Sequence, residues 1–167
     1  MGLSVLQIVR HWPVAEIVVI GIDPANLELS LELGASDVWR VPQKSGTWEI
    51  SGSPGYFDIV LECLGNAEGQ ELAHAMKPRV LVNCCQCEEP VAVRQAELFE
   101  SGTVIYNPGW LESPDLKAVA AMYNRELIDP SVLITRRIPP IPDEYLIAVQ
   151  ELAEGKHIKV IIDWDMK

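Results

Sequence analysis

Four cysteines are the most reactive side chains of this sequence. Cys84, Cys85 and Cys87 form a Cys-Cys-x-Cys cluster, and Cys63 lies earlier in the chain. Such a cluster could bind a metal ion, carry out thiol redox chemistry or simply pack. Because Cys84 and Cys85 stand at the end of an apolar strand, their side chains should point to opposite faces. The chain offers no second Cys or His pair at zinc spacing, so we expect structural, inert thiols and no metal site.

The histidines are the next candidates for chemistry, and none of them stands in a recognisable triad with a nucleophile. They are His11, His74 and His157. We interpret all three as solvated or packing residues. The sequence therefore predicts no catalytic residue in this chain.

Composition limits the class of protein. The 167 residues are typical of one domain, and the formal net charge of −11 argues against nucleic acid as a partner. No apolar run approaches the roughly 20 residues that a membrane span needs. Arg10 and His11 follow the short apolar N-terminal stretch, and no signal-peptide cleavage site is evident. We therefore expect a cytoplasmic protein without a membrane partner.

The stretch Glu16–Pro24 is the element around which the rest of the chain is organised. Its apolar run is mostly β-branched and does not alternate with polar residues, which is typical of a strand buried on both faces of a parallel sheet. Gly-Ile-Asp-Pro then ends the strand Ile17–Ile20 and begins a helix with Pro24 in its first turn. That helix, Ala25–Leu33, should end at Gly34 in a left-handed conformation.

Strands and helices alternate along the remaining sequence, which predicts the α/β class with a parallel sheet. The other predicted strands are Asp37–Val41, Phe57–Leu61, Arg79–Cys84, Thr103–Tyr106 and His157–Asp163, with an extended stretch at Ser131–Ile138. The other predicted helices are Gly2–His11, Glu68–Met76 behind an Asn66 cap, Pro90–Glu100, Ser113–Arg125 and Asp143–Glu154.

Two segments interrupt this alternation. Residues 42–56 are rich in Pro and Gly and predict a loop, in which Thr47–Ile50 could form a hairpin. The proline-rich joint at 139–142 is the one candidate boundary. It divides the chain into residues 1–138 and a C-terminal helix and strand, residues 139–167, which pack on or complete the same domain.

Four stretches carry a resemblance to a known family. They are GLSVLQIVR, EIVVIGIDPANLELSLELGAS, FDIVLECLGN and LAEGKHIKVIIDW. Together they resemble the cofactor-binding half of the medium-chain, zinc-type alcohol dehydrogenase family. The most specific pieces are Glu32–Ala35 and Glu154–Val160. The resemblance covers nearly the whole chain and implies a Rossmann-like parallel sheet with helices on both faces.

The departures from this family matter as much as the match. A full member begins with a catalytic domain that supplies the Cys, His and Glu ligands of a catalytic zinc, and that domain is not in this sequence. Of the G-x-G-x-x-G fingerprint only Gly2 remains, at the place of the third glycine. The first, central strand of the family's sheet is also missing. We therefore expect an N-terminally truncated cofactor domain that binds no zinc.

Three further positions bear on the cofactor. The family's acidic residue, which grips the ribose hydroxyls, aligns with Gly21, and Asp23 follows two residues later. Glycine at that place often accompanies NADP, yet Asp23 would repel a 2′-phosphate, so NAD and NADP both stay open. Lys159 matches a basic residue that reaches the pyrophosphate, although it is equally typical of an exposed strand. Without the glycine loop, we expect binding of either cofactor to be weak or absent.

Small and polar residues follow three successive strands, as Cys63-Leu64-Gly65, Asn83-Cys84 and Tyr106-Asn107. The resemblance implies that they line the nicotinamide and adenine side of a cleft, although any such sheet needs turn residues here. The candidate cofactor-binding residues are Gly2, Gly21, Asp23, Cys63, Gly65, Asn83 and Lys159.

Two functions fit these observations. In the first, the chain is an isolated dinucleotide-binding-type domain that has no dehydrogenase activity alone and acts as a binding or assembly module. In the second, it is a fragment of an active NAD(P)-dependent alcohol or polyol dehydrogenase. Its catalytic domain would then lie outside this chain or on a partner.

The missing central strand predicts a rearrangement, because buried unpaired backbone groups each cost about 1–3 kcal/mol. Either Ile17–Ile20 closes against Phe57–Leu61, or another strand fills the gap. The most available filler is His157–Asp163, from the same or a neighbouring copy. Since the family pairs the strand at Thr103–Tyr106 across a dimer, we expect a homodimer.

Overall fold

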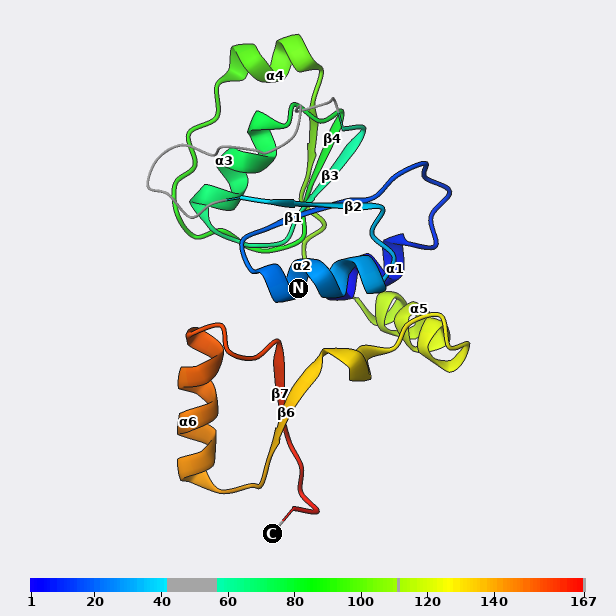
Figure 1. Cartoon of the computed structure of the whole chain (residues 1–167). Coiled ribbons are helices and arrows are strands. Elements are labelled where there is room, and N and C mark those ends of the chain that lie inside the picture. The colour runs from blue at the N-terminus through cyan, green and yellow to red at the C-terminus, as the bar shows by residue number, and fades with distance from the viewer. Residues whose placement is uncertain (42–56, 111, 167) are drawn as a thin grey trace. The chain divides into compact units, whose positions relative to one another are not determined.

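The structure is a computed structural model that describes residues 1–41, 57–110 and 112–166 (Figure 1). The chain forms two compact units, Met1–Val119 and Ala120–Lys167. This division falls earlier in the chain than the one after residue 138 that the sequence suggested. The predicted loop at 42–56 and its optional hairpin lie outside the described residues.

The first unit begins with a helix, a strand, a helix and a strand, as predicted. They are α1 (Gly2–Val9), β1 (Val18–Gly21), α2 (Pro24–Glu32) and β2 (Asp37–Arg40). β1 and β2 pair in parallel, with Val18 opposite Asp37 and Gly21 opposite Arg40. α2 packs against both strands, and Gly34 follows it with a φ of +108°. The predicted helix start and left-handed end of this βαβ unit are therefore confirmed.

A second parallel sheet of the first unit has the order β3-β4-β5. Its strands are β3 (Ile59–Glu62), β4 (Val80–Asn83) and β5 (Val104–Tyr106). Val80 lies opposite Ile59 on one side and Val104 on the other. α3 (Ala67–Ala75) packs on β3, and the Asn66 side chain caps it by accepting from the Gly69 amide at 2.8 Å. These are the strands and the cap that the sequence predicted.

Two helices of this part of the chain differ from the prediction. α4 spans Gln95–Ser101 and not Pro90–Glu100. It ends at Gly102, whose φ is +65°, where the prediction placed its end. α5 spans Ser113–Asn124, one residue short of the predicted end, and its apolar residues Leu116, Val119 and Tyr123 are exposed.

One hydrophobic cluster of the first unit lies beside α3. Val41, Leu72 and Met76 are buried together, and Ile20, Phe57 and Val60 pack around them. The rings of Trp39 and Phe57 meet edge to face, with 5.5 Å between their centroids. Residues of β1 and β3 thus share one hydrophobic cluster, although these two strands are not paired with each other.

The second unit is a βαβ unit of its own. Its elements are η1 (Pro130–Leu133), β6 (Ile134–Ile138), α6 (Pro142–Ala153) and β7 (Lys159–Ile162). β6 and β7 pair in parallel, and Arg136 joins β6 to α6 by ion pairs with Glu144 and Glu151. The predicted extended stretch Ser131–Ile138 is wrong in its first half, because η1 is a 3-10 turn. The Asp129 side chain caps this turn by accepting from the Ser131 amide at 2.9 Å.

The expected closure of Ile17–Ile20 against Phe57–Leu61 is wrong for a single copy of the chain. Among the described residues of the first unit, β1 pairs with β2 and not with β3. The physical reason lies in burial, because all four residues of β1 are only partly buried. Water can reach an edge of that kind, so leaving it open costs less than the prediction assumed. Filling of the gap by His157–Asp163, from the same or a neighbouring copy, stays a prediction.

No helix within the described ranges is long and apolar enough to cross a membrane.

Candidate functional site

Glu62 is the centre of the polar groups at the carboxyl ends of β3, β4 and β5. Its side chain is buried, with 4% of its surface exposed. The Oε1 atom accepts hydrogen bonds from the amides of Leu64 (2.6 Å) and Gly65 (3.0 Å), and Oε2 accepts from Gln70 Nε2 at 3.1 Å. Hydrogen bonds to a charged group each contribute about 1.5–3 kcal/mol, so this carboxylate fixes the turn that follows β3.

The same network continues across the strand ends. Gln70 Nε2 also donates to Asn83 Oδ1 at 3.0 Å, and Asn83 Nδ2 donates to Asn107 Oδ1 at 2.8 Å. Asn83 and Asn107 were predicted to line one cleft, and the structure brings them into contact. Glu62 and Gln70, which belong to the same hydrogen-bond network, were not predicted from the sequence. Glu62 stood within the FDIVLECLGN stretch, directly after the predicted strand, and that position was the available signal.

Gly65 is held in a conformation that other residues rarely adopt. Its φ is +74°, and a Cβ added there would lie 2.8 Å from Cys85 Cβ and 2.9 Å from the carbonyl oxygen of Gln86. Gly69 is equally tight, since a Cβ would lie 2.7 Å from Glu62 Oε1. The turn after β3 therefore packs directly against the segment after β4.

Three of the four cysteines meet at these strand ends. The Cys63 and Cys84 thiols lie close enough to shift each other's pKa, Cys84 Sγ donates to the carbonyl oxygen of Val82 at 3.9 Å, and Cys85 Sγ donates to the carbonyl oxygen of Cys63 at 3.2 Å. The hydrogen bond from Cys63 lowers the pKa of Cys84 to about 7, although burial and the charge of Glu62 oppose this shift. The same hydrogen bond, burial and nearby charge raise the pKa of Cys63. Burial is the main cause that raises the pKa of Cys85.

The N-terminal end of α1 lies beside this cluster. A Cβ added to Gly2 would lie 3.8 Å from Cys63 Cβ, so the structure brings together two predicted cofactor-binding residues. Both Met1 and Gly2 are exposed. A helix N-terminus attracts anions through its free amides and its dipole. The arrangement is therefore compatible with a phosphate group above Cys63.

Gly21 and Asp23 lie at the carboxyl end of β1, as predicted, but Asp23 has a structural role. Its Oδ1 atom caps α2 by accepting from the amides of Ala25 (2.8 Å) and Asn26 (3.2 Å). Among the described residues, Oδ2 has no hydrogen-bond partner. One carboxylate oxygen thus remains available to a ribose hydroxyl.

Lys159 belongs to β7 in the second unit, where its side chain is exposed. Its carbonyl oxygen accepts a hydrogen bond from Thr135 Oγ1 at 3.3 Å. Its predicted contact with a pyrophosphate stays a prediction.

Metal ligands and basic surfaces are the remaining kinds of candidate site. Within the described residues, no three His, Cys, Asp or Glu side chains converge on a point that could hold a metal ion.

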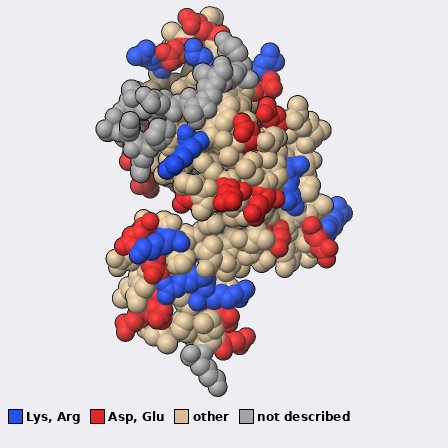
Figure 2. All heavy atoms as spheres, in the orientation of Figure 1, with Lys and Arg blue, Asp and Glu red and all other residues tan. Residues whose placement is uncertain are grey.

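On the face that Figure 2 shows, acidic and basic side chains are interspersed. The exclusion of nucleic acid as a partner stays a prediction.

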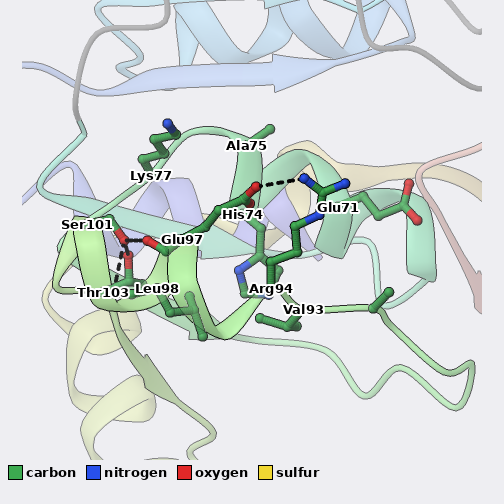
Figure 3. A pocket seen from close by; sticks show the side chains of 11 residues that line it. Glu71, His74, Ala75, Lys77, Val93, Arg94, Glu97, Leu98, Ser101 and Thr103 are labelled. Atoms are coloured by element: carbon green, nitrogen blue, oxygen red, sulfur yellow. Dashed lines mark hydrogen bonds and ion pairs between the residues drawn. The ribbon is translucent and has the colours of Figure 1, made fainter.

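A shallow pocket of about 190 Å³ lies between α3 and α4 in the first unit (Figure 3). Arg94 and Glu97 form an ion pair at its wall, with 3.2 Å between Nη1 and Oε1. Burial lowers the pKa of His74 despite the opposing charge of Glu97. The wall mixes charges of both signs in a small volume, so this pocket is a weaker candidate than the strand ends.

Comparison with known proteins supports the fold. No family model matches the chain, and no curated protein matches it in sequence. Among solved structures, L-idonate 5-dehydrogenase from Escherichia coli K-12 is similar over 97% of this chain and 47% of its own, with a TM-score of 0.78 and 19% identity. Zinc-dependent alcohol dehydrogenase 2 from Streptococcus pneumoniae is similar over 99% and 49%, with a TM-score of 0.80 and 19% identity.

A third solved structure is S. aureus TarJ in complex with NADPH, which has a TM-score of 0.77 and 19% identity over 99% of this chain and 52% of its own. The chain thus spans about half the length of the structures it resembles. The chain has an α/β fold with parallel sheets, of the kind found in Rossmann-like dehydrogenase domains, and the predicted fold class is confirmed.

Proposed function

We propose that this chain is a dinucleotide-binding-type domain related to zinc-type medium-chain alcohol dehydrogenases, and that it has no dehydrogenase turnover by itself. The observation that carries the proposal is the similarity of nearly the whole chain to about half of each of several such enzymes. The residues quoted from the sequence support the same relationship independently of the fold.

The proposed nucleotide site is the group of strand ends around Cys63, Gly65 and Asn83. The exposed N-terminal end of α1 beside Cys63 would receive the phosphates, and Asp23 Oδ2 would accept from a ribose hydroxyl. The glycine loop that brings backbone close to a pyrophosphate is not among these residues. We therefore expect weak binding, with NAD favoured over NADP because the Asp23 carboxylate repels a 2′-phosphate.

We expect no turnover because of the kinds of side chain at the proposed site. Its side chains are thiols, amides and one buried carboxylate that already accepts three hydrogen bonds. The Cys84 thiolate could accept a proton, but none of these groups is a cation that could stabilise the alkoxide of an alcohol as it is oxidised. A nicotinamide cofactor would supply the hydride chemistry, and a further domain would have to supply the groups that activate the alcohol.

Thermal unfolding of the purified chain with increasing NAD or NADP tests the binding. Ligand at 100 times its dissociation constant stabilises the folded state by about 2.7 kcal/mol. We expect a rise of the midpoint only at high cofactor concentration, and a larger rise with NAD. Equal midpoints at all concentrations would contradict nucleotide binding. Alcohol-dependent reduction of either cofactor by the chain alone would contradict the proposed lack of activity.

The alternative is that the chain is part of an active alcohol or polyol dehydrogenase whose catalytic domain lies elsewhere. The specific observation in its favour is α6, where Tyr145, Leu146 and Ile147 are 52%, 65% and 47% exposed. An apolar helix surface of this kind is typical of a face that another part of a protein covers. Sequencing the coding region on both sides distinguishes the two proposals, because a fragment requires an adjoining reading frame or a partner chain.

We also propose a homodimer formed through β5. In the described part of the sheet, β5 is the edge strand next to β4. Val104 and Tyr106 are 60% and 55% exposed on it, and an exposed apolar edge is a template for pairing with another chain.

A further inference from the structure

We propose that Cys63 and Cys84 are a redox-active thiol pair, which a small-molecule disulfide oxidises to an intramolecular disulfide. This inference concerns the chain's own chemistry and does not rest on the proposed nucleotide site. It differs from the expectation of inert thiols because the structure brings together two cysteines that are distant in sequence.

The geometry of the pair follows from strand register. Glu62 and Asn83 are partners on the parallel strands β3 and β4, and Cys63 and Cys84 come directly after them. The Cys84 amide still donates to the Glu62 carbonyl oxygen at 2.8 Å, so the strands remain adjacent at this point. Neighbouring strands lie about 4.8 Å apart. This spacing falls within the Cα separation of about 4.4–6.8 Å that a disulfide requires.

Because Cys63 and Cys84 each follow a paired residue of parallel strands, their side chains leave the sheet on the same face, and each thiol shifts the pKa of the other. Both side chains are partly buried, so a small reagent can reach them. A disulfide at this place would join the ends of two strands that are already paired.

The two sulfurs have unequal acidity, which assigns their roles. The hydrogen bond from Cys63 lowers the pKa of Cys84 to about 7, so a large share of Cys84 is thiolate at neutral pH. The charged and titratable groups around the pair are the Glu62 carboxylate, the Cys85 thiol and the amino group of Met1, which acts on Cys85. Cys84 is therefore the attacking sulfur, and Cys63 is the resolving one.

The reaction proceeds in two exchange steps. The Cys84 thiolate attacks one sulfur of glutathione disulfide, which forms a Cys84–glutathione bond and releases one glutathione thiolate. Cys63 then loses its proton to that thiolate and attacks the Cys84 sulfur, which releases the second glutathione. The two protein thiols lose two electrons and two protons, and one glutathione disulfide becomes two glutathione thiols.

The other two cysteines have different surroundings. Cys85 donates its thiol hydrogen to the Cys63 carbonyl oxygen, and its Cβ packs over Gly65. Cys87 donates to the Glu89 carbonyl oxygen at 3.6 Å. Cys87 therefore provides a matched control, since it is also partly buried but has no described thiol neighbour.

The test is oxidation of the full chain with glutathione disulfide at pH 7, followed by alkylation of the remaining thiols and peptide mapping. Trypsin separates Cys63, in residues 45–79, from the other three cysteines, in residues 80–94. Fragmentation of the linked peptide then identifies which of the three is joined. We expect a Cys63–Cys84 link in wild type and in Cys87→Ser.

The variant Cys63→Ala should stop the reaction after its first step and accumulate glutathione on Cys84. The variant Cys84→Ala should form neither the link nor that adduct. The proposal is overturned by a wild-type chain that stays fully reduced, by a link from Cys63 to Cys85 or Cys87, or by Cys63→Ala acquiring glutathione mainly elsewhere. Circular dichroism of each variant shows whether it is folded, and the mapping of wild type decides the question without any variant.

Discussion

At the scale of single residues, Gly65 combines a left-handed backbone conformation with close contacts to neighbouring atoms. Its φ is +74°, and two atoms lie only 2.8 and 2.9 Å from the place that a Cβ would occupy. Gly102 has a φ of +65° and nothing within 4 Å of that place. The two glycines thus share a backbone conformation and differ in the space around them. That difference makes a controlled comparison possible.

We expect Gly65→Ala to lower the free energy of unfolding by about 3 kcal/mol, because backbone strain and close contact act together. Gly102→Ala should cost about 1 kcal/mol, from the left-handed conformation alone. Urea denaturation of both variants measures these values. Equal losses would show that the space around Gly65 has no energetic effect.

The Cys63–Cys84 hydrogen bond predicts a pH dependence of thiol reactivity. The alkylation rate of Cys84 follows its thiolate fraction, so it should reach half its maximum near pH 7. Cys63→Ala removes the donor that lowers this pKa, so the half-maximum should move upward in pH, towards that of an ordinary cysteine. Alkylation followed by mass spectrometry at several pH values measures both curves. A half-maximum unchanged by Cys63→Ala would contradict the role of this hydrogen bond.

At the scale of elements, Asp23 connects the α2 cap to the proposed cofactor preference. Asp23→Ala removes the acceptor for two amides and should cost about 1 kcal/mol of stability. Asp23→Asn keeps an equivalent oxygen but removes the charge, so stability should change little while NADP binding improves relative to NAD. Thermal unfolding with each cofactor measures both effects. If Asp23→Asn left the cofactor preference unchanged, the ribose of the nucleotide would not bind beside Asp23.

Most elements could be predicted because local signals agreed with tertiary structure. β1 and α2 have a β-branched run, an Asp cap and a proline in the first turn, and all three signals point to one arrangement. α4 was less predictable, since Pro90 suits the start of a helix but the β-branched Val91 and Val93 follow it. The helix begins only at Gln95, after an Arg94 that makes no side-chain cap.

The candidate site was predictable in outline and not in detail. The carboxyl ends of parallel strands had to converge, which is why Asn83 and Asn107 could be assigned to one place. The Gln70 side chain that joins Glu62 to Asn83 comes from a helix, and its direction depends on how α3 packs on β3. Sequence spacing alone cannot give that packing.

At the scale of the whole molecule, strand pairing was the least predictable feature. The expectation that Ile17–Ile20 would close against Phe57–Leu61 is not met, since β1 and β3 belong to separate sheets. The sequence also did not indicate that β6 and β7 pair in parallel within the second unit. Pairing within a nearby segment costs less loop-closure entropy than pairing across the chain.

Association through β5 predicts a mass of about twice 18.5 kDa in solution. A lysine on this strand would oppose its symmetry-related copy, so Val104→Lys should give monomers. Phe99→Lys is the matched control, because Phe99 is 88% exposed on α4 and not on the strand. Light scattering after size-exclusion chromatography measures the mass. A monomeric wild type, or dissociation by Phe99→Lys alone, would contradict this interface.

The most direct test of the central claim is an NMR titration of the ¹⁵N-labelled chain with NAD. The proposed nucleotide site predicts concentration-dependent shifts of the amide signals of Gly2, Gly21, Cys63, Gly65 and Asn83, with little change in α4. Amide shifts that leave these five residues unmoved, or that gather around α4, would show that the strand ends are not a nucleotide site.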